Sequence, residues 1–133
     1  MYVYAAVAPA QGEMTSLILP AADTAMMTLF LEHVSQTFAK SFIVMQVDGA
    51  GWHHSDELVI PSNIRLIAQP PYSPEVNPVE HVWDDLREKY FGNRAFPSLD
   101  ALIEVLCQGL GELADDPERL RSLTGFPHLN VTI

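Results

Sequence analysis

Cysteine is almost missing from this 133-residue sequence, which has only Cys107. One thiol excludes an internal disulfide and a cysteine-based zinc site, and it makes a reducing, cytoplasmic setting the expected one. The apolar runs are far shorter than the ~20 residues that a membrane-spanning helix requires. No basic segment followed by an apolar one marks a secretory signal. We therefore expect no association with a membrane.

Basic residues are also scarce, because 7 Lys and Arg stand against 17 Asp and Glu, for a formal net charge of −10. A surface that binds DNA by neutralising its phosphates is basic. The acidic composition therefore argues against a free-standing nucleic-acid binder. Carboxylates are, however, the ligands from which divalent-cation sites are made. Hydrophobic residues make up 48% of the chain, and its length suits one globular domain over residues 1–133.

Proline and glycine divide the chain into short alternating elements. The expected strands are Tyr2–Ala8, Met14–Leu19, Ser41–Val47 and Ile64–Ala68, the first two forming a hairpin around the Pro9–Glu13 turn. The expected helices run from Asp23 to about Lys40, from Pro78 to about Phe91, from Ser98 onward and from Pro117 to Leu123, with a helical turn near Ser55–Leu58. This order predicts an α/β fold, a mixed sheet with flanking helices.

Apolar spacing predicts which faces are buried. Ser41–Val47 is nearly all apolar and reads as a strand buried on both faces. In the helix after Asp23 the expected buried positions are Met27, Phe30, Leu31, Val34 and Phe38, and after Ser98 they are Leu99, Leu102, Ile103, Leu106, Leu110 and Leu113. Val79, Val82, Trp83, Leu86 and Tyr90 form a third stripe, with Trp83 in the core. Cys107 is expected to be buried and inert.

Asp48 follows the most apolar strand directly. The carboxyl end of a strand in an open α/β sheet is where ligands and catalytic groups collect. The competing interpretation is a plain Asp-Gly turn. No mirrored strand follows in Ala50–His54, which favours a functional role for Asp48.

Glu80 stands in the first turn of the expected helix that begins at Pro78. Asn77, Pro78 and Glu80 match a capping box, so the local pattern alone favours a cap over catalysis. A strand-end Asp48 and a helix-start Glu80 can, however, converge. Carboxylates that converge without cysteine suit Mg²⁺ or Mn²⁺, and two such ions about 4 Å apart can clamp a phosphoryl displacement.

Two long stretches carry a family resemblance: VMQVDGAGWHHS, and NIRLIAQPPYSPEVNPVEHVWDDL. Together they resemble the core signature of DDE-superfamily endonucleases, and most of all the mariner-related transposases of bacterial insertion sequences. The resemblance extends from Tyr2 to about Phe126, nearly the whole chain. It implies a ribonuclease-H-like fold and metal-dependent DNA strand cleavage and transfer.

The resemblance also implies roles for individual residues. Asp48 matches the second catalytic acid and Glu80 the third, 32 positions apart, a spacing slightly shorter than is usual in the family. His53 or His54 matches a histidine that follows the second acid. The loop that aims the glutamate is matched by Tyr72, Ser73, Pro74, Asn77 and Pro78. Asp48 and Glu80 would each hold a divalent ion, Mg²⁺ or Mn²⁺.

Nothing in the 133 residues matches the family's first aspartate, on its first strand, or its helix-turn-helix region. Glu13 and Asp23, the acids before the first helix, do not take that position. We therefore expect a catalytic core that lacks its first strand, is inactive alone and binds DNA weakly. Its partners would be an upstream transposase segment and a second copy of the chain in a homo-oligomer. The alternatives are a non-catalytic remnant or second-frame product that binds a longer transposase, and an unrelated metal phosphohydrolase.

Three further residues near Glu80 leave alternatives open. His81 points about 100° away from Glu80 around the helix and is read as structural. Asp84 is either an auxiliary metal ligand or part of a solvated face, and the second is favoured because like charges four residues apart repel. Arg87 is either a DNA contact or an ordinary surface residue.

Overall fold

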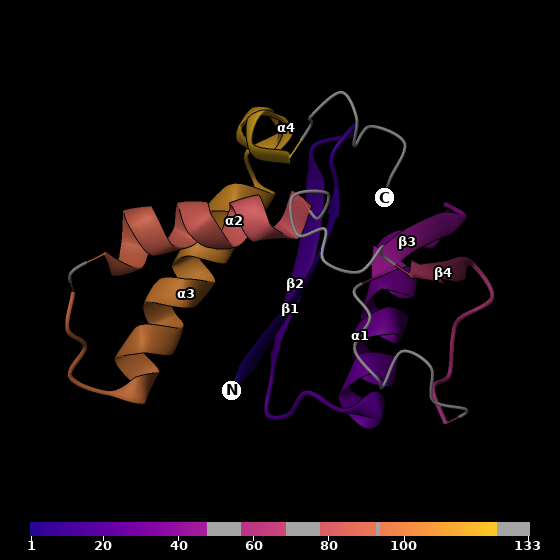
Figure 1. The fold of residues 1–133 in the computed structure, drawn as a ribbon, viewed down its shortest axis with the longest axis horizontal. Coiled ribbons are helices and arrows are strands. Elements are labelled where there is room, and N and C mark those ends of the chain that lie inside the picture. Colours follow the sequence, from indigo (N-terminus) through magenta and orange to yellow (C-terminus); the bar gives the residue numbers. More distant parts are fainter. Residues whose placement is uncertain (48–56, 69–77, 93, 125–133) are drawn as a thin grey trace. The chain divides into compact units, whose positions relative to one another are not determined.

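The computed structural model describes residues 1–47, 57–68, 78–92 and 94–124. Its element order is β-β-α-β-β followed by helices, the mixed α/β arrangement that the sequence predicts (Figure 1). The chain divides into two compact units. The first contains the open end of the N-terminal hairpin, the helix that follows it and the next two strands. The second contains the turn of that hairpin and the helices after the last strand.

The hairpin consists of β1 (Tyr2–Ala8) and β2 (Glu13–Leu19), joined by the predicted turn. Gly12 closes this turn, since its N–H donates to the carbonyl of Ala8 at 2.9 Å. Its φ of 66° lies in the left-handed region that glycine adopts without steric penalty. The second strand begins one residue earlier than the sequence predicts.

Helix α1 (Thr24–Thr37) begins at the expected cap, because the Asp23 carboxylate accepts the N–H of Met26 at 2.9 Å. The predicted apolar face is confirmed at Met27, Phe30, Leu31 and Val34. The helix ends at Thr37 rather than near Lys40. Phe38 has φ −115° and ψ 47°, outside the helical region, so the chain turns away there.

Strands β3 (Ile43–Val47) and β4 (Ile64–Ala68) pair in parallel with Ile43 opposite Ile64 and Val47 opposite Ala68. Figure 1 shows α1 alongside this pair, and its apolar side chains form one core with Ile43, Met45 and Ile64. The prediction of a strand buried on both faces is wrong. Only alternate residues of β3 are fully buried, because α1 covers one face, and Phe42 just before the strand is 66% exposed.

Hydrogen bonds from Tyr4 and Thr15 fasten the hairpin to the rest of the first unit. The Tyr4 hydroxyl donates to the carbonyl of Ala21 at 2.9 Å, and Thr15 Oγ1 lies 2.6 Å from His33 Nε2 on α1. Tyr4 also belongs to the same apolar core as Ile43. The hairpin and the β3–β4 pair therefore share one core on α1.

The expected single mixed sheet is not what the described strands form. They make two separate two-stranded sheets, β1–β2 and β3–β4. The physical reason is that the apolar core joins β1 to β3 through side chains, while no described strand supplies the backbone hydrogen bonds between them.

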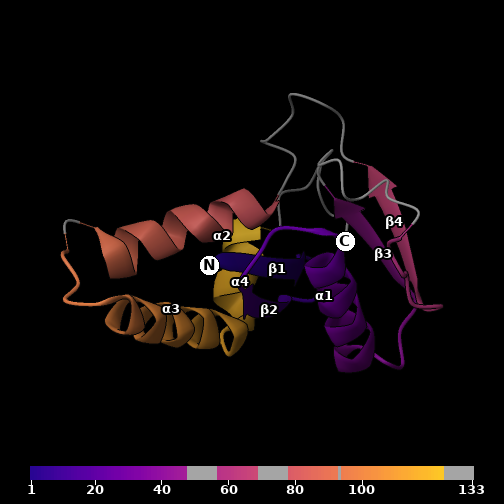
Figure 2. The ribbon, with the colours of Figure 1, turned by 90° about the horizontal axis from the view of Figure 1, so that it is seen from below.

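The second unit is helical. Helix α2 (Pro78–Leu86) passes directly into the π-helical turn η3 (Arg87–Phe91), α3 spans Leu99–Ala114, and α4 spans Pro117–Thr124. Figure 2 shows α2 and α3 side by side. The start of α3 is as predicted, since Ser98 accepts the N–H of Ala101 at 3.1 Å. The single α-helix predicted from Pro78 to Phe91 is instead α-helical for its first nine residues only.

Two predictions about side chains on α3 are wrong. Leu99 is 59% exposed, and Cys107 is exposed rather than buried. The buried stripe of α3 is Leu106, Gly109, Leu110 and Leu113. Cys107 follows Leu106 by one residue, which rotates it about 100° off that stripe. Among the described residues, no helix is both long and apolar enough to cross a bilayer.

Candidate active site

Glu80 is the candidate catalytic residue whose surroundings the structure describes. It is the third residue of α2, and its side chain is exposed. Among residues 79–86 of α2, the buried ones are Val82 and Leu86, at 0% and 2% exposure. Val82 follows Glu80 by two residues, or about 200° around the helix, so burial of Val82 turns Glu80 outward. A carboxylate in this position is accessible to a cation or a substrate and also lies at the positive end of the helix dipole.

The remaining candidates fall largely outside the described residues. Asp48, His53, His54, Tyr72, Ser73 and Asn77 lie there, and Pro78 is the first residue of α2. Along the chain, β3 leads to Asp48 and β4 leads to the segment that contains Tyr72. Because β3 and β4 are parallel, their carboxyl ends at Val47 and Ala68 share one edge of the sheet. Asp48 is next in sequence after Val47.

The neighbours of Glu80 on α2 follow the simpler interpretations. Asp84 pairs with Arg87, and both side chains are about two-thirds exposed, at 67% and 64%. This is the solvated charged face that the sequence favours. Trp83 is partly buried rather than in the core, because Val82 and Leu86 occupy the buried seam. His81 is also partly buried and takes part in an interaction of its own.

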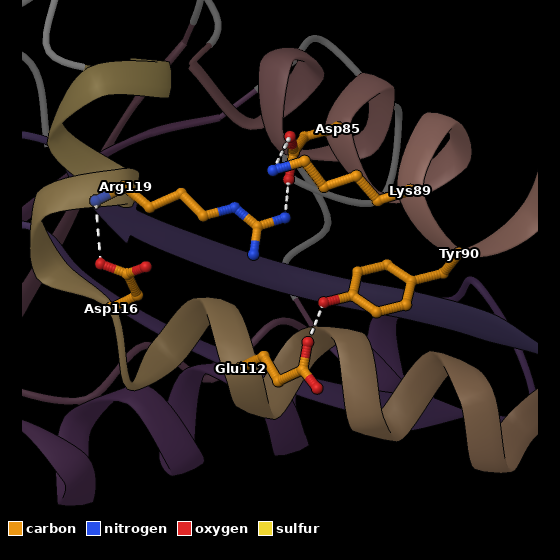
Figure 3. Close-up of polar contacts among 6 residues, drawn as sticks. All are labelled: Asp85, Lys89, Tyr90, Glu112, Asp116 and Arg119. Carbon is orange, nitrogen blue, oxygen red and sulfur yellow. Dashed lines mark hydrogen bonds and ion pairs between the residues drawn. The ribbon is translucent and has the colours of Figure 1, made fainter.

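A set of charged and polar contacts, not predicted from the sequence, fastens α2 to the helices around it (Figure 3). The Asp85 carboxylate pairs with the Arg119 guanidinium of α4 and lies 3.5 Å from the Lys89 ammonium. In the next turn, the Tyr90 hydroxyl donates to the Glu112 carboxylate of α3. In the sequence, Asp85 is simply an acidic residue next to the apolar Leu86. Nothing in this local pattern indicates that its partner is Arg119, 34 residues away.

These contacts shift three pKa values. The hydrogen bond with Glu112 raises the pKa of Tyr90, and the same bond lowers the pKa of Glu112. For Arg119, burial opposes the charged form, but hydrogen bonds to Tyr90 and Asp85 outweigh it and the pKa of the guanidinium rises. All three groups therefore keep their ordinary charge states near neutral pH.

The described residues include few groupings of potential metal donors. Within residues 1–47, 57–68, 78–92 and 94–124, no three His, Cys, Asp or Glu side chains gather as a metal site would require. Glu80 itself fits a hard cation, being an exposed carboxylate. It would need at least one further acid, and Asp48 is the candidate.

The order of these elements, with a strand that ends before Asp48 and a helix that begins two residues before Glu80, agrees with a known family. The family described as DDE superfamily endonuclease matches residues 1–103. The chain belongs to this family. The matched DDE endonuclease segment includes Asp48 and Glu80 and ends within α3, so α4 lies beyond it.

One relative extends the similarity beyond that segment. The protein y4pE/y4sA of Sinorhizobium fredii (strain NBRC 101917 / NGR234), described as uncharacterized, is 36% identical over 123 residues. The aligned region covers 92% of this DDE endonuclease chain and 91% of the relative. No solved structure matches the chain.

Proposed function

We propose that this DDE endonuclease chain is the part of a DNA transposase that carries the second and third catalytic acids, Asp48 and Glu80. The reaction is DNA strand cleavage followed by strand transfer. The observation that carries the proposal is the family match over residues 1–103, which includes both acids. It is supported by the placement of Glu80, exposed in the first turn of α2.

Asp48 and Glu80 would hold Mg²⁺ or Mn²⁺, which when bound would stabilise the charge that develops on the phosphate oxygens. The protein's contribution is to present the two carboxylates at fixed points. Glu80 is held by the helix start at Pro78 and by the buried seam of α2. The site would be supported by residues from the segments before and after β4: His53, His54, Tyr72, Ser73 and Asn77.

The first acid and the strand that carries it would come from outside these 133 residues. In support, β1 pairs only with β2 and β3 only with β4 among the described strands. A strand inserted between β1 and β3 would join the two small sheets into the single mixed sheet of a ribonuclease-H-like domain. That strand would bring the first acid next to β3, the strand that precedes Asp48.

The net charge supports a second candidate function. At −10 the chain is poorly suited to bind DNA by itself, because phosphate contacts supply most non-specific affinity. A non-catalytic role as a protein partner of a longer transposase would need no such contacts.

Plasmid nicking with Mg²⁺ or Mn²⁺ distinguishes the two functions. The 133-residue chain alone is expected to leave plasmid DNA with element ends intact. Addition of a family segment carrying the first strand and its aspartate, fused or as a separate fragment, is expected to produce metal-dependent nicking. Glu80→Gln should abolish that gain, whereas Glu104→Gln, the same change at an exposed position of α3, should not.

Two outcomes would contradict the catalytic proposal. Nicking by the chain alone that is lost in Asp48→Asn would mean that another acid replaces the first one. Complementation that gives no nicking, together with stable binding to the complementing segment, would favour the non-catalytic partner.

A further inference from the structure

Helix α4 lies beyond the matched family segment, yet it contacts both α2 and the turn of the N-terminal hairpin. Its buried side chains are Leu120 and Thr124, both at 0% exposure, and the Thr124 hydroxyl donates back to the carbonyl of Leu120. Eight residues are too few to form a stable helix alone. The position of α4 is therefore set by what it packs against.

The hairpin turn holds one side of α4. Arg121 donates to the carbonyl of Gln11 at 3.0 Å. Gly12 lies so close that a Cβ there would come within 2.4 Å of the carbonyl oxygen of Pro117. The start of α4 is thus seated directly on the backbone of the turn.

The other side of α4 contacts α2 through Arg119, which points toward Asp85 (Figure 3). The two side chains are only 20% and 10% exposed, so little water competes for the pair. The Nε atom of Arg119 is buried and has no hydrogen-bond partner among the described residues, which means that the guanidinium gives up hydration to reach Asp85. Truncation of a partner in a shielded pair leaves an uncompensated charge, so this contact strongly favours one orientation of α2.

Asp85 is five residues after Glu80 on the same helix. A helix is stiff over that distance, about 7.5 Å along its axis. If α2 rotated about its axis, Glu80 and Asp85 would turn by the same angle, and Asp85 would move away from Arg119. A contact that fixes Asp85 therefore fixes the direction in which Glu80 projects.

We propose that Arg119 is a positioning residue for Glu80: through Asp85 it holds α2 in the rotation that aims this carboxylate at the metal. The inference rests on the proposed function of Glu80. It assigns to α4, outside the matched family segment, a part in building the site. Arg119 touches neither the metal nor the substrate.

The test measures the affinity of the full 133-residue chain for Mn²⁺, by the paramagnetic broadening of NMR signals, on samples that circular dichroism shows to be folded. Arg119→Met is expected to weaken Mn²⁺ binding about fivefold. Asp85→Asn, which keeps the shape of the side chain, should do the same. Arg119→Lys should recover most of the affinity, because it restores the charge. Arg87→Met, which removes an exposed arginine from the helical continuation of α2, is the matched control and should leave the affinity unchanged.

Glu80→Gln separates this inference from the proposed function. If Glu80→Gln weakens Mn²⁺ binding while Asp85→Asn and Arg119→Met do not, the positioning role is overturned and the proposed function stands. If Glu80→Gln has no effect, Glu80 is not a ligand and both are overturned. If Arg119→Met does not fold, the test relies on Asp85→Asn and Arg119→Lys. Equal Mn²⁺ affinities in these two variants and the parent would overturn the inference.

Discussion

Gly109 of α3 lies directly against Leu86 of α2, so that a Cβ on Gly109 would come within 2.9 Å of Leu86 Cδ2. The Tyr90 ring would stand 3.0 Å from the same Cβ. Leu86 is 2% exposed, so a shift of its side chain would disturb the packing around it. The absence of a side chain at Gly109 is therefore what allows α3 to approach α2 this closely.

Gly109→Ala is accordingly expected to destabilise the protein. Overpacking costs roughly 1–3 kcal/mol, and the higher helix propensity of alanine offsets ~1 kcal/mol of that cost. Gly111→Ala is the matched control, two residues along the same helix, where a new Cβ would meet no atom of the described residues within 4 Å. It should raise stability by up to ~1 kcal/mol. Urea denaturation of both variants measures the difference, and equal midpoints would contradict the close approach.

Divalent cations should stabilise the folded chain. The proposed function requires the carboxylates of Asp48 and Glu80 to hold one ion, and without it two such carboxylates would repel each other. At a Mn²⁺ concentration ten times the dissociation constant the gain is about 1.4 kcal/mol, which raises the melting temperature by roughly 4 °C. Differential scanning fluorimetry should show this shift in the parent and in Glu104→Gln.

Asp48→Asn and Glu80→Gln should each remove the cation-dependent shift. If both variants respond to Mn²⁺ as the parent does, the ion binds elsewhere in the chain.

The hydrogen bond between Tyr90 and Glu112 predicts a dependence of stability on pH. The folded state lowers the pKa of Glu112 below its usual value of 4.5. The contribution of ionised Glu112 to the free energy of unfolding is therefore complete above pH 4.5. It disappears as the pH falls through the lowered pKa of the folded state. Tyr90 behaves in the opposite sense, because its pKa is raised above 10.0 and its contribution disappears as the pH rises through that raised value.

Glu112→Gln and Tyr90→Phe should thus lower the melting temperature at pH 7. The difference between Glu112→Gln and the parent should shrink below pH 4. Because Glu112 is exposed, the effect will be small, and Glu104→Gln provides the baseline for the loss of one exposed acid. A difference that stays constant from pH 3 to pH 7 would show that the hydrogen bond does not depend on the charge of Glu112.

The two separate sheets predict self-association. Strand edges at β1 and β3 that lack a partner among the described strands are templates for another chain. We expect light scattering on a size-exclusion column to find a homo-oligomer. Addition of the complementing first-strand segment should reduce the oligomer, because it competes for the same edges. A monomer in the absence of that segment would contradict this prediction.

Local signals allowed much of the fold to be predicted. The caps at Asp23 and Ser98 lie where the sequence places them, because a cap depends on a side chain and a backbone N–H three residues away. The bounds of β4 at Ile64 and Ala68 are also as predicted. Family membership could be recognised in the same way, since the motifs around Asp48 and Glu80 are continuous in sequence. The roles of those two residues remain predictions.

The features that the sequence did not reveal depend on partners distant along the chain. Cys107 and Phe42 are exposed because packing covers only one side of α3 and one face of β3. The pairing of Asp85 with Arg119 joins residues 34 positions apart. A one-dimensional pattern specifies which residues prefer a helix, a strand or a cap, because those preferences act over a few residues. The tertiary structure determines which face of an element is buried and which charged side chain is shielded from water. The reason is that burial depends on contacts between elements that are distant in the sequence.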